Sequence, residues 1–451
     1  MTIARRTGLV LMLVSSAFSV LFALALQRTP HSGIVDFKIV YLGARCLVEH
    51  HDPYDESQVQ QVFEAEGGKV PADPIERLKF QRALMTSVYL PNALLCLAPF
   101  AMLGWATAYS LWTTLTVILL TLAACLMWQV AADRAPVVSA CLLGFMLANT
   151  EVLFAYGNAA GVAIGLCAVA VWCFLKQRLP WIGVVCLAIS LAIKPHDSAF
   201  VWLYLFLAGG IFRKRAIQTV LVVLVLSLPA IVWAYNVAPN WMQEVRSNLQ
   251  LVSVRGGSSD PGPSGIGNGT GGGIIDLQSA ISVFRDDPRT YNLVTYIVCA
   301  PLFIGWVLAI LRTPSTQVRA WLALATMAAL SMLPIYHRPY DAKLLMLAVP
   351  ACAVLWADRG YRGWMALLTT FSAILLSSDI PITMLVAFGR TLPRYPTSIS
   401  KQILVVVATR PIPLVLLAMS IFYLWIYLRE PSAGLKAASP EGNSDAFPST
   451  Q

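Results

Sequence analysis

A few acidic and basic residues, far apart in the sequence, could together transfer a group from an anionic lipid. They are Asp36 just after a long apolar run, Lys194 and His196 in "IKPHD", and His337 and Arg338 in "YHRPYD". A carboxylate within hydrogen-bond reach can take the proton of an attacking hydroxyl. Fixed cations can stabilise the negative charge that grows on a leaving phosphate. This chemistry requires that the fold bring the residues to one face of a membrane.

Three further residues are candidates for contact with substrate: Asn158 in "YGN", Tyr54 in "HHDPYD" and Asp341 at the end of "YHRPYD". Each is polar at the edge of an apolar stretch, and such residues often mark functional sites in membrane proteins. His50, His51 and Asp52 resemble metal ligands only faintly, and we interpret them as a solvated turn. We therefore expect no metal and no cofactor.

Several of these residues also have purely structural interpretations. Asp36 could serve as a helix N-cap, a role compatible with that of a base because a helix N-terminus keeps a carboxylate ionised. Lys194 could extend its amine to the membrane interface. Arg338 could be an interfacial anchor, and Asp341 could simply flank a span.

The composition indicates a polytopic membrane protein. The 451 residues are 57% hydrophobic and 12% charged, with mean hydropathy +0.68, whereas soluble globular proteins carry roughly 25% charged residues. The net charge of +9 fits basic cytoplasmic loops better than nucleic-acid binding. The nine cysteines lie mostly in apolar stretches without disulfide or zinc spacing, so we interpret them as buried thiols.

The apolar runs predict an all-α protein with about 12 transmembrane helices and both termini in the cytoplasm. Arg5 and Arg6 should hold the N-terminus inside, before an uncleaved first span. The predicted transmembrane domain covers 1–431, and a disordered cytoplasmic tail follows at 432–451. The charge pattern places these segments outside: 27–85, 193–197, 237–291, 336–341 and 388–410.

The assignment of sides contains one conflict. With Gly104 and Lys176 both inside, the number of crossings between them must be even, but three apolar segments lie there. The stretch 137–158 includes Asn149 and Glu151, and polar groups at membrane depth must face protein or a wet cavity. We therefore predict that 137–158 is a broken or re-entrant helix whose "YGN" end points outward.

Two of the outer segments are large. In the first, "GIVDFKIVYLGARCLVEHHDPYD" predicts an amphipathic interfacial helix with its apolar face in the headgroup layer. The second contains "RGGSSDPGPSGIGNGTGGGIID", which is too rich in glycine to form a packed core. It is either a slack linker or a loop that closes over substrate. Its "NGT" at Asn268 matches a glycosylation triplet, although such triplets arise by chance.

The ordered set of motifs resembles the GT-C superfamily of membrane glycosyltransferases, specifically glycosyltransferase family 87. The motifs that carry the resemblance extend from about residue 8 to 356, and they are "VDFKIVYLGARCLVEHHDPYD", "VYLPNALLCLAPFAML", "YGNAAGVAIGL", "LAIKPHDS" and "YHRPYDAKLLMLAVP". Members include polyprenyl-phosphate-mannose-dependent α-1,2-mannosyltransferases.

The resemblance implies roles for individual residues. Asp36 matches the family's catalytic base, His337 the histidine near the reacting centre, and Lys194–Pro195 the Lys-Pro that meets the donor phosphate. The chain departs from the family where Asn158 replaces a common Gln, and where "HRPYD" replaces His-Asp-Tyr.

The expected activity is transfer of a hexose, with mannose the first choice, from a polyprenyl-phosphate sugar to a lipid or glycan acceptor. It would proceed with inversion on the extracytoplasmic side of the cell membrane, in a monomer with no nucleic-acid partner. The alternative is a polytopic transporter or lipid flippase. Transporters typically show internal repeats, and we detect none in this sequence.

Overall fold

The computed structural model describes residues 2–27, 36–266 and 268–430, and all regular structure in this part of the chain is helical. The tail expected at 432–451 lies outside the described residues. The helices, in order, are α1 (Ile3–Gln27), α2 (Asp36–Val48), α3 (Glu56–Ala65), α4 (Pro74–Leu84), α5 (Pro91–Ala101), α6 (Trp105–Ala131), α7 (Pro136–Ala148), α8 (Glu151–Tyr156), α9 (Ala160–Leu175), α10 (Pro180–Ile193), α11 (Pro195–Ala208), α12 (Gly210–Val237), α13 (Trp241–Ser253), α14 (Leu277–Ile281), α15 (Pro288–Arg312), α16 (Gln317–Leu330), the 3₁₀ helix η1 (Pro339–Ala348), α17 (Val349–Ala357), α18 (Tyr361–Leu376), α19 (Asp379–Gly389), α20 (Ile399–Thr409) and α21 (Pro411–Arg429).

The chain is a polytopic all-α membrane protein, as predicted. Among the described residues, seven helical segments are long and apolar enough to cross a membrane, or eight if the bent pair α18–α19 is one span. The helices α9, α10 and α16 have only 14 to 16 residues, fewer than the roughly 20 that a straight span needs. The count of about 12 crossings therefore stays a prediction.

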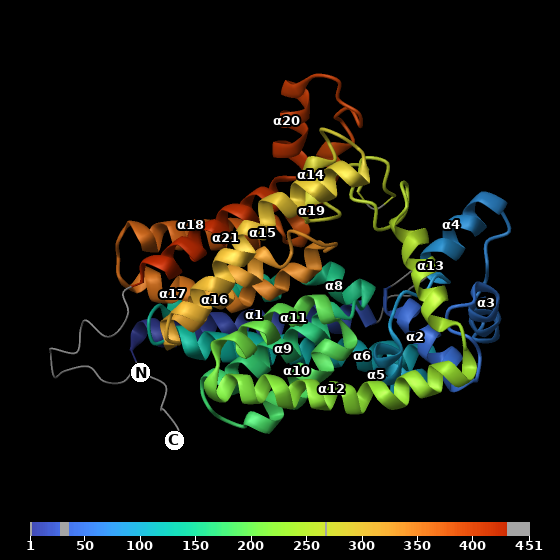
Figure 1. Ribbon diagram of the computed structural model, residues 1–451, viewed down its shortest axis with the longest axis horizontal. Helices are drawn as coiled ribbons and strands as arrows, with labels where there is room; N and C mark the ends of the chain where they lie inside the picture. Colours follow the sequence, from blue (N-terminus) through green and yellow to red (C-terminus); the bar gives the residue numbers. More distant parts are fainter. Residues whose placement is uncertain (1, 28–35, 267, 431–451) are drawn as a thin grey trace.

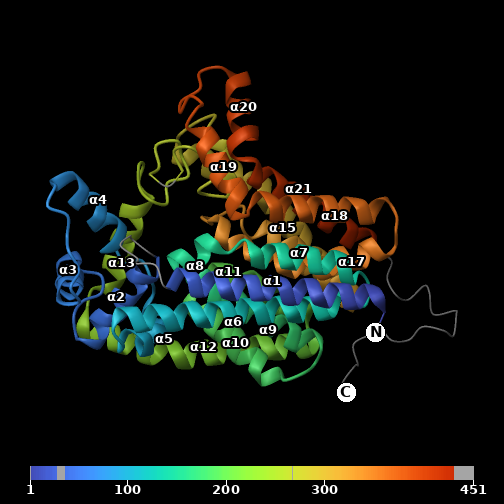
Figure 2. The ribbon, with the colours of Figure 1, turned by 180° about the vertical axis from the view of Figure 1, so that it is seen from behind.

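Two contacts define the ends of the bundle. Arg5 at the start of α1 pairs with Asp133, after α6, at 3.1 Å. At the other end of α1, Gln27 Nε2 donates to the carbonyl oxygen of Ser110 at 3.1 Å. Helix α6 therefore begins at the Gln27 end and finishes at the Arg5 end, while α7 returns alongside α1 (Figures 1 and 2).

This arrangement shows that our assignment of Gly104 was wrong. Gly104 directly precedes α6 and lies at the Gln27 end, opposite Arg5. The apolar run before it forms α5, an 11-residue helix with Pro99 inside it, only about 16 Å long. It packs against α2 and does not carry the chain to the Arg5 end. Once Gly104 is assigned to the Gln27 end, the three passes α6, α7–α8 and α9 bring Lys176 to the Arg5 end. Three crossings between the two residues are then consistent with their sides.

The predicted break in 137–158 is confirmed. Helix α7 ends at Ala148 and α8 begins at Glu151, yet the whole segment Pro136–Tyr156 qualifies as one span. Lys343 of η1 donates to the carbonyl oxygens of Met146, at 3.3 Å, and of Asn149. The Asp379 carboxylate of α19 accepts from Val152 N at 3.0 Å. A cation thus caps the C-terminus of α7 and an acid caps the N-terminus of α8, which favours both helix dipoles.

Helix α2 is amphipathic, but its apolar face does not lie in lipid. Phe37, Val40 and Tyr41 are each at most 2% exposed. The Phe37 ring stacks on Trp112 of α6 at 4.9 Å, and Tyr41 donates to the carbonyl oxygen of Leu103 at 2.8 Å. Our expectation of a headgroup-facing helix was wrong because α5 and α6 cover this face. The helix is therefore fixed to the bundle by protein contacts.

The glycine-rich segment is ordered in its described residues, contrary to the slack linker. The Asp260 carboxylate accepts from Gly256 N at 2.7 Å, Gly262 N at 2.8 Å and Ser264 Oγ at 2.8 Å. Buried Arg410 donates to the carbonyl oxygen of Pro261 at 3.1 Å. Polar anchoring thus replaces the apolar core that this sequence cannot supply.

Asn268 is also buried in this segment. Its amide donates to the carbonyl oxygen of Pro261, so the "NGT" triplet does not present a glycosylation acceptor. Together with α14, α19 and α20, the segment stands above the Gln27 end of the bundle (Figure 1).

Candidate active site

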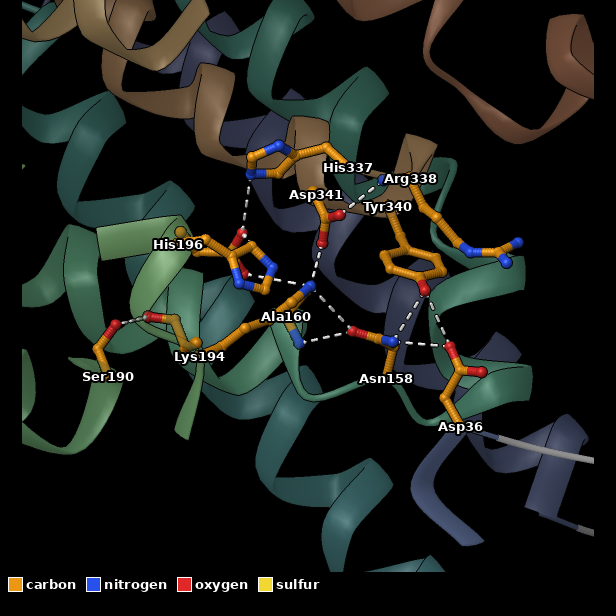
Figure 3. A network of polar contacts seen from close by, with 12 residues as sticks. Asp36, Asn158, Ala160, Ser190, Lys194, His196, His337, Arg338, Tyr340 and Asp341 are labelled. Atoms are coloured by element: carbon orange, nitrogen blue, oxygen red, sulfur yellow. Dashed lines mark hydrogen bonds and ion pairs between the residues drawn. The ribbon is translucent and has the colours of Figure 1, made fainter. Parts of the chain in front are cut away.

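Asp36 lies in a network of hydrogen bonds (Figure 3). The network is at the Gln27 end of the bundle, because the neighbouring Phe37 stacks on Trp112 of α6, close to Ser110. As the first residue of α2, its Oδ2 accepts from Asn158 Nδ2 at 2.6 Å and from the Tyr340 hydroxyl at 3.0 Å. Asn158 Nδ2 also lies 2.9 Å from the Tyr340 oxygen. Both donors act on one oxygen, so the carboxylate is oriented while its Oδ1 accepts no hydrogen bond from the described residues.

The corner at Gly157 and Asn158 sets this geometry. Gly157 ends α8 with φ +62°, and a Cβ there would lie 2.8 Å from the Phe37 Cβ. A side chain at this position would be strained twice, by the backbone angle and by the contact. The indole of Trp112 donates to the Gly157 carbonyl at 2.7 Å. The close approach of this corner to α2 thus places Asn158 beside Asp36.

Asn158 also connects the acid to Lys194. Its Oδ1 accepts from Ala160 N at 2.8 Å and from Lys194 Nζ at 3.4 Å. Asp36 and Lys194 therefore share one site, as the proposed chemistry requires. Lys194 is only 8% exposed, so it does not extend to the membrane interface.

The positive charge of Lys194 is compensated by acidic residues of the protein. It lies at the break between α10 and α11, where Pro195 begins the second helix. Its ammonium forms ion pairs with Asp341 and, at 3.4 Å, with Asp197. The second oxygen of Asp341 accepts from Arg338 N at 2.7 Å, which caps η1. Asp341 therefore belongs to the site as the partner of Lys194, and it does more than flank a span.

Arg338 is the cation of this network without an acidic partner. Its guanidinium donates to the Tyr336 hydroxyl and to the carbonyl oxygen of Ser258, the latter at 3.0 Å. Among the described residues, no carboxylate forms an ion pair with it, although Asp36 is near enough to act on its charge. An anion could therefore bind Arg338 without displacing an internal ion pair.

His196 and His337 meet at Asp197. Their rings lie edge to face with centroids 5.1 Å apart, and their Nε2 atoms are 3.9 and 3.8 Å from Asp197 Oδ1. His337 Nδ1 is 3.0 Å from the carbonyl oxygen of Ile335. Burial lowers the pKa of His337, which favours the neutral ring near pH 7. These three residues are grouped closely enough to hold a metal ion.

Tyr54 lies outside this network. Its hydroxyl donates to the carbonyl oxygen of Tyr89 at 2.9 Å, and its own carbonyl accepts from Asn248 of α13. Tyr89 in turn is near enough to Asp36 and Lys194 to interact electrostatically with both. The structure thus gives Tyr54 a supporting position, one layer behind the site.

Sequence reasoning missed two members of the site. Asp197 stands in the same "IKPHD" motif as Lys194 and His196, and an acid at the end of an apolar run should have been included. Tyr340 carries no such signal. Its contact with Asp36 depends on how η1 is rotated, which the residue pattern does not reveal.

Comparison with known proteins gives one result. The model of glycosyltransferase family 87 matches residues 88–335, more than half of the chain. This region includes Asn158, Lys194 and Asp197, whereas Asp36 and Arg338 fall outside it. Searches among curated proteins and solved structures gave no match.

Proposed function

Because the chain belongs to glycosyltransferase family 87, we propose that it moves a hexose from a polyprenyl-phosphate sugar to a hydroxyl of a lipid or glycan acceptor. Mannose is the first sugar to test. The family establishes a membrane glycosyltransferase, and the finer statements here are proposals. They rest on one observation: an oriented carboxylate shares a site, at one end of a membrane bundle, with a guanidinium that has no carboxylate partner among the described residues.

Asp36 is the proposed general base. Its Oδ2 is held by Asn158 and Tyr340, so its Oδ1 can accept the proton of the acceptor hydroxyl. The acceptor oxygen bonds to the anomeric carbon, the bond from that carbon to the phosphate oxygen breaks, and the proton moves to Asp36. A single direct displacement inverts the anomeric centre.

Arg338 is the proposed principal contact of the donor phosphate. The leaving group is a lipid phosphate monoester, whose negative charge grows as the sugar departs. A cation fixed nearby stabilises this charge more than it stabilises the bound donor. Lys194 would contribute less than the sequence suggested, because Asp341 and Asp197 already compensate its charge. His337 adds a polar contact on the same side.

The proposal also includes a location. The first 431 residues would act as one transmembrane unit and as a monomer, with the Gln27 end on the extracytoplasmic face of the cell membrane. This orientation follows from Arg5 and Arg6 at the opposite end, since basic residues favour the cytoplasmic side.

The experiment that separates this function from a transporter uses the purified chain in liposomes. Polyprenyl-phosphate mannose is added with a lipid extract as the source of acceptor, and released polyprenyl phosphate is measured by mass spectrometry. A glycosyltransferase cleaves the donor, whereas a flippase moves it between leaflets intact. Donor that is translocated but never cleaved would refute the proposal.

A further inference from the structure

We propose that His196, Asp197 and His337 form a site for one divalent transition-metal ion of the zinc class, next to the donor-phosphate position. One atom of each residue lies within 4.8 Å of those of the other two. The two Nε2 to Asp197 Oδ1 distances are 3.9 and 3.8 Å. Tetrahedral ligands about 2.1 Å from one zinc ion lie about 3.4 Å from one another. The two distances to Asp197 would therefore shorten by about half an ångström, and the widest separation in the cluster by up to about 1.4 Å, on binding the ion.

Two acceptor atoms of this cluster, His337 Nε2 and Asp197 Oδ1, face each other at 3.8 Å. A carbonyl oxygen only accepts, so the proton of His337 lies on Nδ1, toward the carbonyl of Ile335. This tautomer leaves Nε2 as a lone pair directed at Asp197 Oδ1. Both atoms are buried and have no hydrogen-bond partner among the described residues. With Asp197 ionised, these two acceptors repel each other, and a bound cation would satisfy both.

The hydrogen bond at His337 Nδ1 is also the support that metal-binding histidines usually have. Such a residue almost always donates its other ring nitrogen to a carboxylate or backbone carbonyl, which fixes the orientation of the ring. The carbonyl of Ile335 meets this requirement at 3.0 Å. Two imidazoles and one carboxylate suit zinc and its neighbours better than magnesium or calcium.

The charge balance of the network is compatible with a bound cation. When all three are ionised, the carboxylates of Asp36, Asp197 and Asp341 outnumber by one the permanent cations Lys194 and Arg338. A buried group of charges is favourable when its signs balance. A dication at Asp197 gives a small positive excess, which a singly charged phosphodiester donor would neutralise. Lys194 lies 3.4 Å from Asp197 Oδ2, which leaves Oδ1 for the ion.

One side of the cluster is open. The side chains of Asp197 and His337 are at most 1% exposed, whereas that of His196 is 33% exposed. Zinc sites that act on substrates have three protein ligands and an open position. The ion would enter past His196, and an oxygen of the donor phosphate could take the open position. This role rests on the proposed function, but the metal site itself does not.

The test measures metal directly. The chain is purified without a histidine tag, stripped with chelator and dialysed against Zn²⁺, and zinc per chain is measured by mass spectrometry. We expect one zinc per wild-type chain. Losing a supporting second-shell partner costs 10–100-fold in affinity, so His196→Gln, Asp197→Asn and His337→Gln should each bind more than about 100-fold more weakly. The matched control is His51→Gln, in the loop after α2, which should still bind one zinc.

The outcomes separate the two proposals. The metal site is refuted if wild-type protein binds no zinc, or if the three site variants bind it as tightly as the His51→Gln control. His196 is partly exposed, so its variant gives a result even if the two buried variants fail to fold. Failure to release polyprenyl phosphate would refute the proposed function, whether or not zinc is bound.

Discussion

Replacing Asn158 with aspartate should disable the proposed base while leaving the shape of the site almost unchanged. The Asn158 amide donates to Asp36 Oδ2 at 2.6 Å, and in the variant a carboxylate oxygen takes its place. Two carboxyl groups this close retain one proton between them near neutral pH. A proton held there prevents Asp36 from accepting the proton of the sugar acceptor.

The expected size of the effect follows from the strength of the hydrogen bond in which the two carboxyl groups hold the shared proton. A hydrogen bond to a charged group contributes about 1.5–3 kcal/mol, which corresponds to roughly 10–150-fold in rate. Lys194 Nζ, 3.4 Å from Asn158 Oδ1, would offset part of the repulsion between the two acids. We therefore expect about a 30-fold lower rate of transfer at pH 7, from the middle of that range.

The assay compares the pH–rate profiles of donor cleavage for the wild type, Asn158→Asp and Asn158→Gln. Raising the pH should remove the shared proton and restore part of the activity of Asn158→Asp. Asn158→Gln keeps an amide donor, so its acidic limb should stay where that of the wild type lies. If Asn158→Asp has the wild-type rate and profile, Asn158 does not act on the base and the reasoning is refuted.

Three other changes test separate parts of the account. Tyr340→Phe removes the second donor to Asp36 and should lower kcat about fivefold, for a hydrogen bond of about 1 kcal/mol; an unchanged kcat would contradict the role given to this hydroxyl. Lys343→Met uncaps α7 and should cost about 2 kcal/mol of stability together with activity; an unchanged melting temperature would refute the capping role. Burial raises the pKa of Asp276, the last residue of the glycine-rich segment, to about 8 from 3.8. The stability that the protonated carboxyl contributes is therefore lost progressively as pH rises from about 4 to about 8. Between pH 6 and 8 unfolding should become easier by up to about 1.4 kcal/mol per pH unit, and Asp276→Asn should flatten this dependence in thermal unfolding; equal slopes for both proteins would contradict it.

The sequence predicted the members of the site better than the path of the chain. Asp36, Lys194 and His337 each follow or precede an apolar run, so assigning sides to the runs was enough to bring them together. Gly104 was assigned to the wrong end because the hydropathy of α5 is that of a membrane-spanning helix. Hydropathy does not reveal that this short helix with an internal proline packs on α2 instead.

Other features depend on contacts between distant segments. The apolar face of α2 could cover lipid or protein equally well from its pattern alone, and only the position of α5 and α6 decides. The order of the glycine-rich segment depends on Arg410, more than a hundred residues away in the sequence, which binds its backbone carbonyls. The residue types of a single segment therefore predict neither what covers α2 nor what holds the glycine-rich segment.

The central claim is that Asp36 takes the proton of the acceptor. Its most direct test is the single-turnover rate of Asp36→Asn with polyprenyl-phosphate mannose prebound, alongside the affinity for that donor. The account predicts a rate lower by several orders of magnitude, with donor affinity and membrane expression close to those of the wild type. A near-normal rate in this variant would contradict the account, because the base would then have to be another residue.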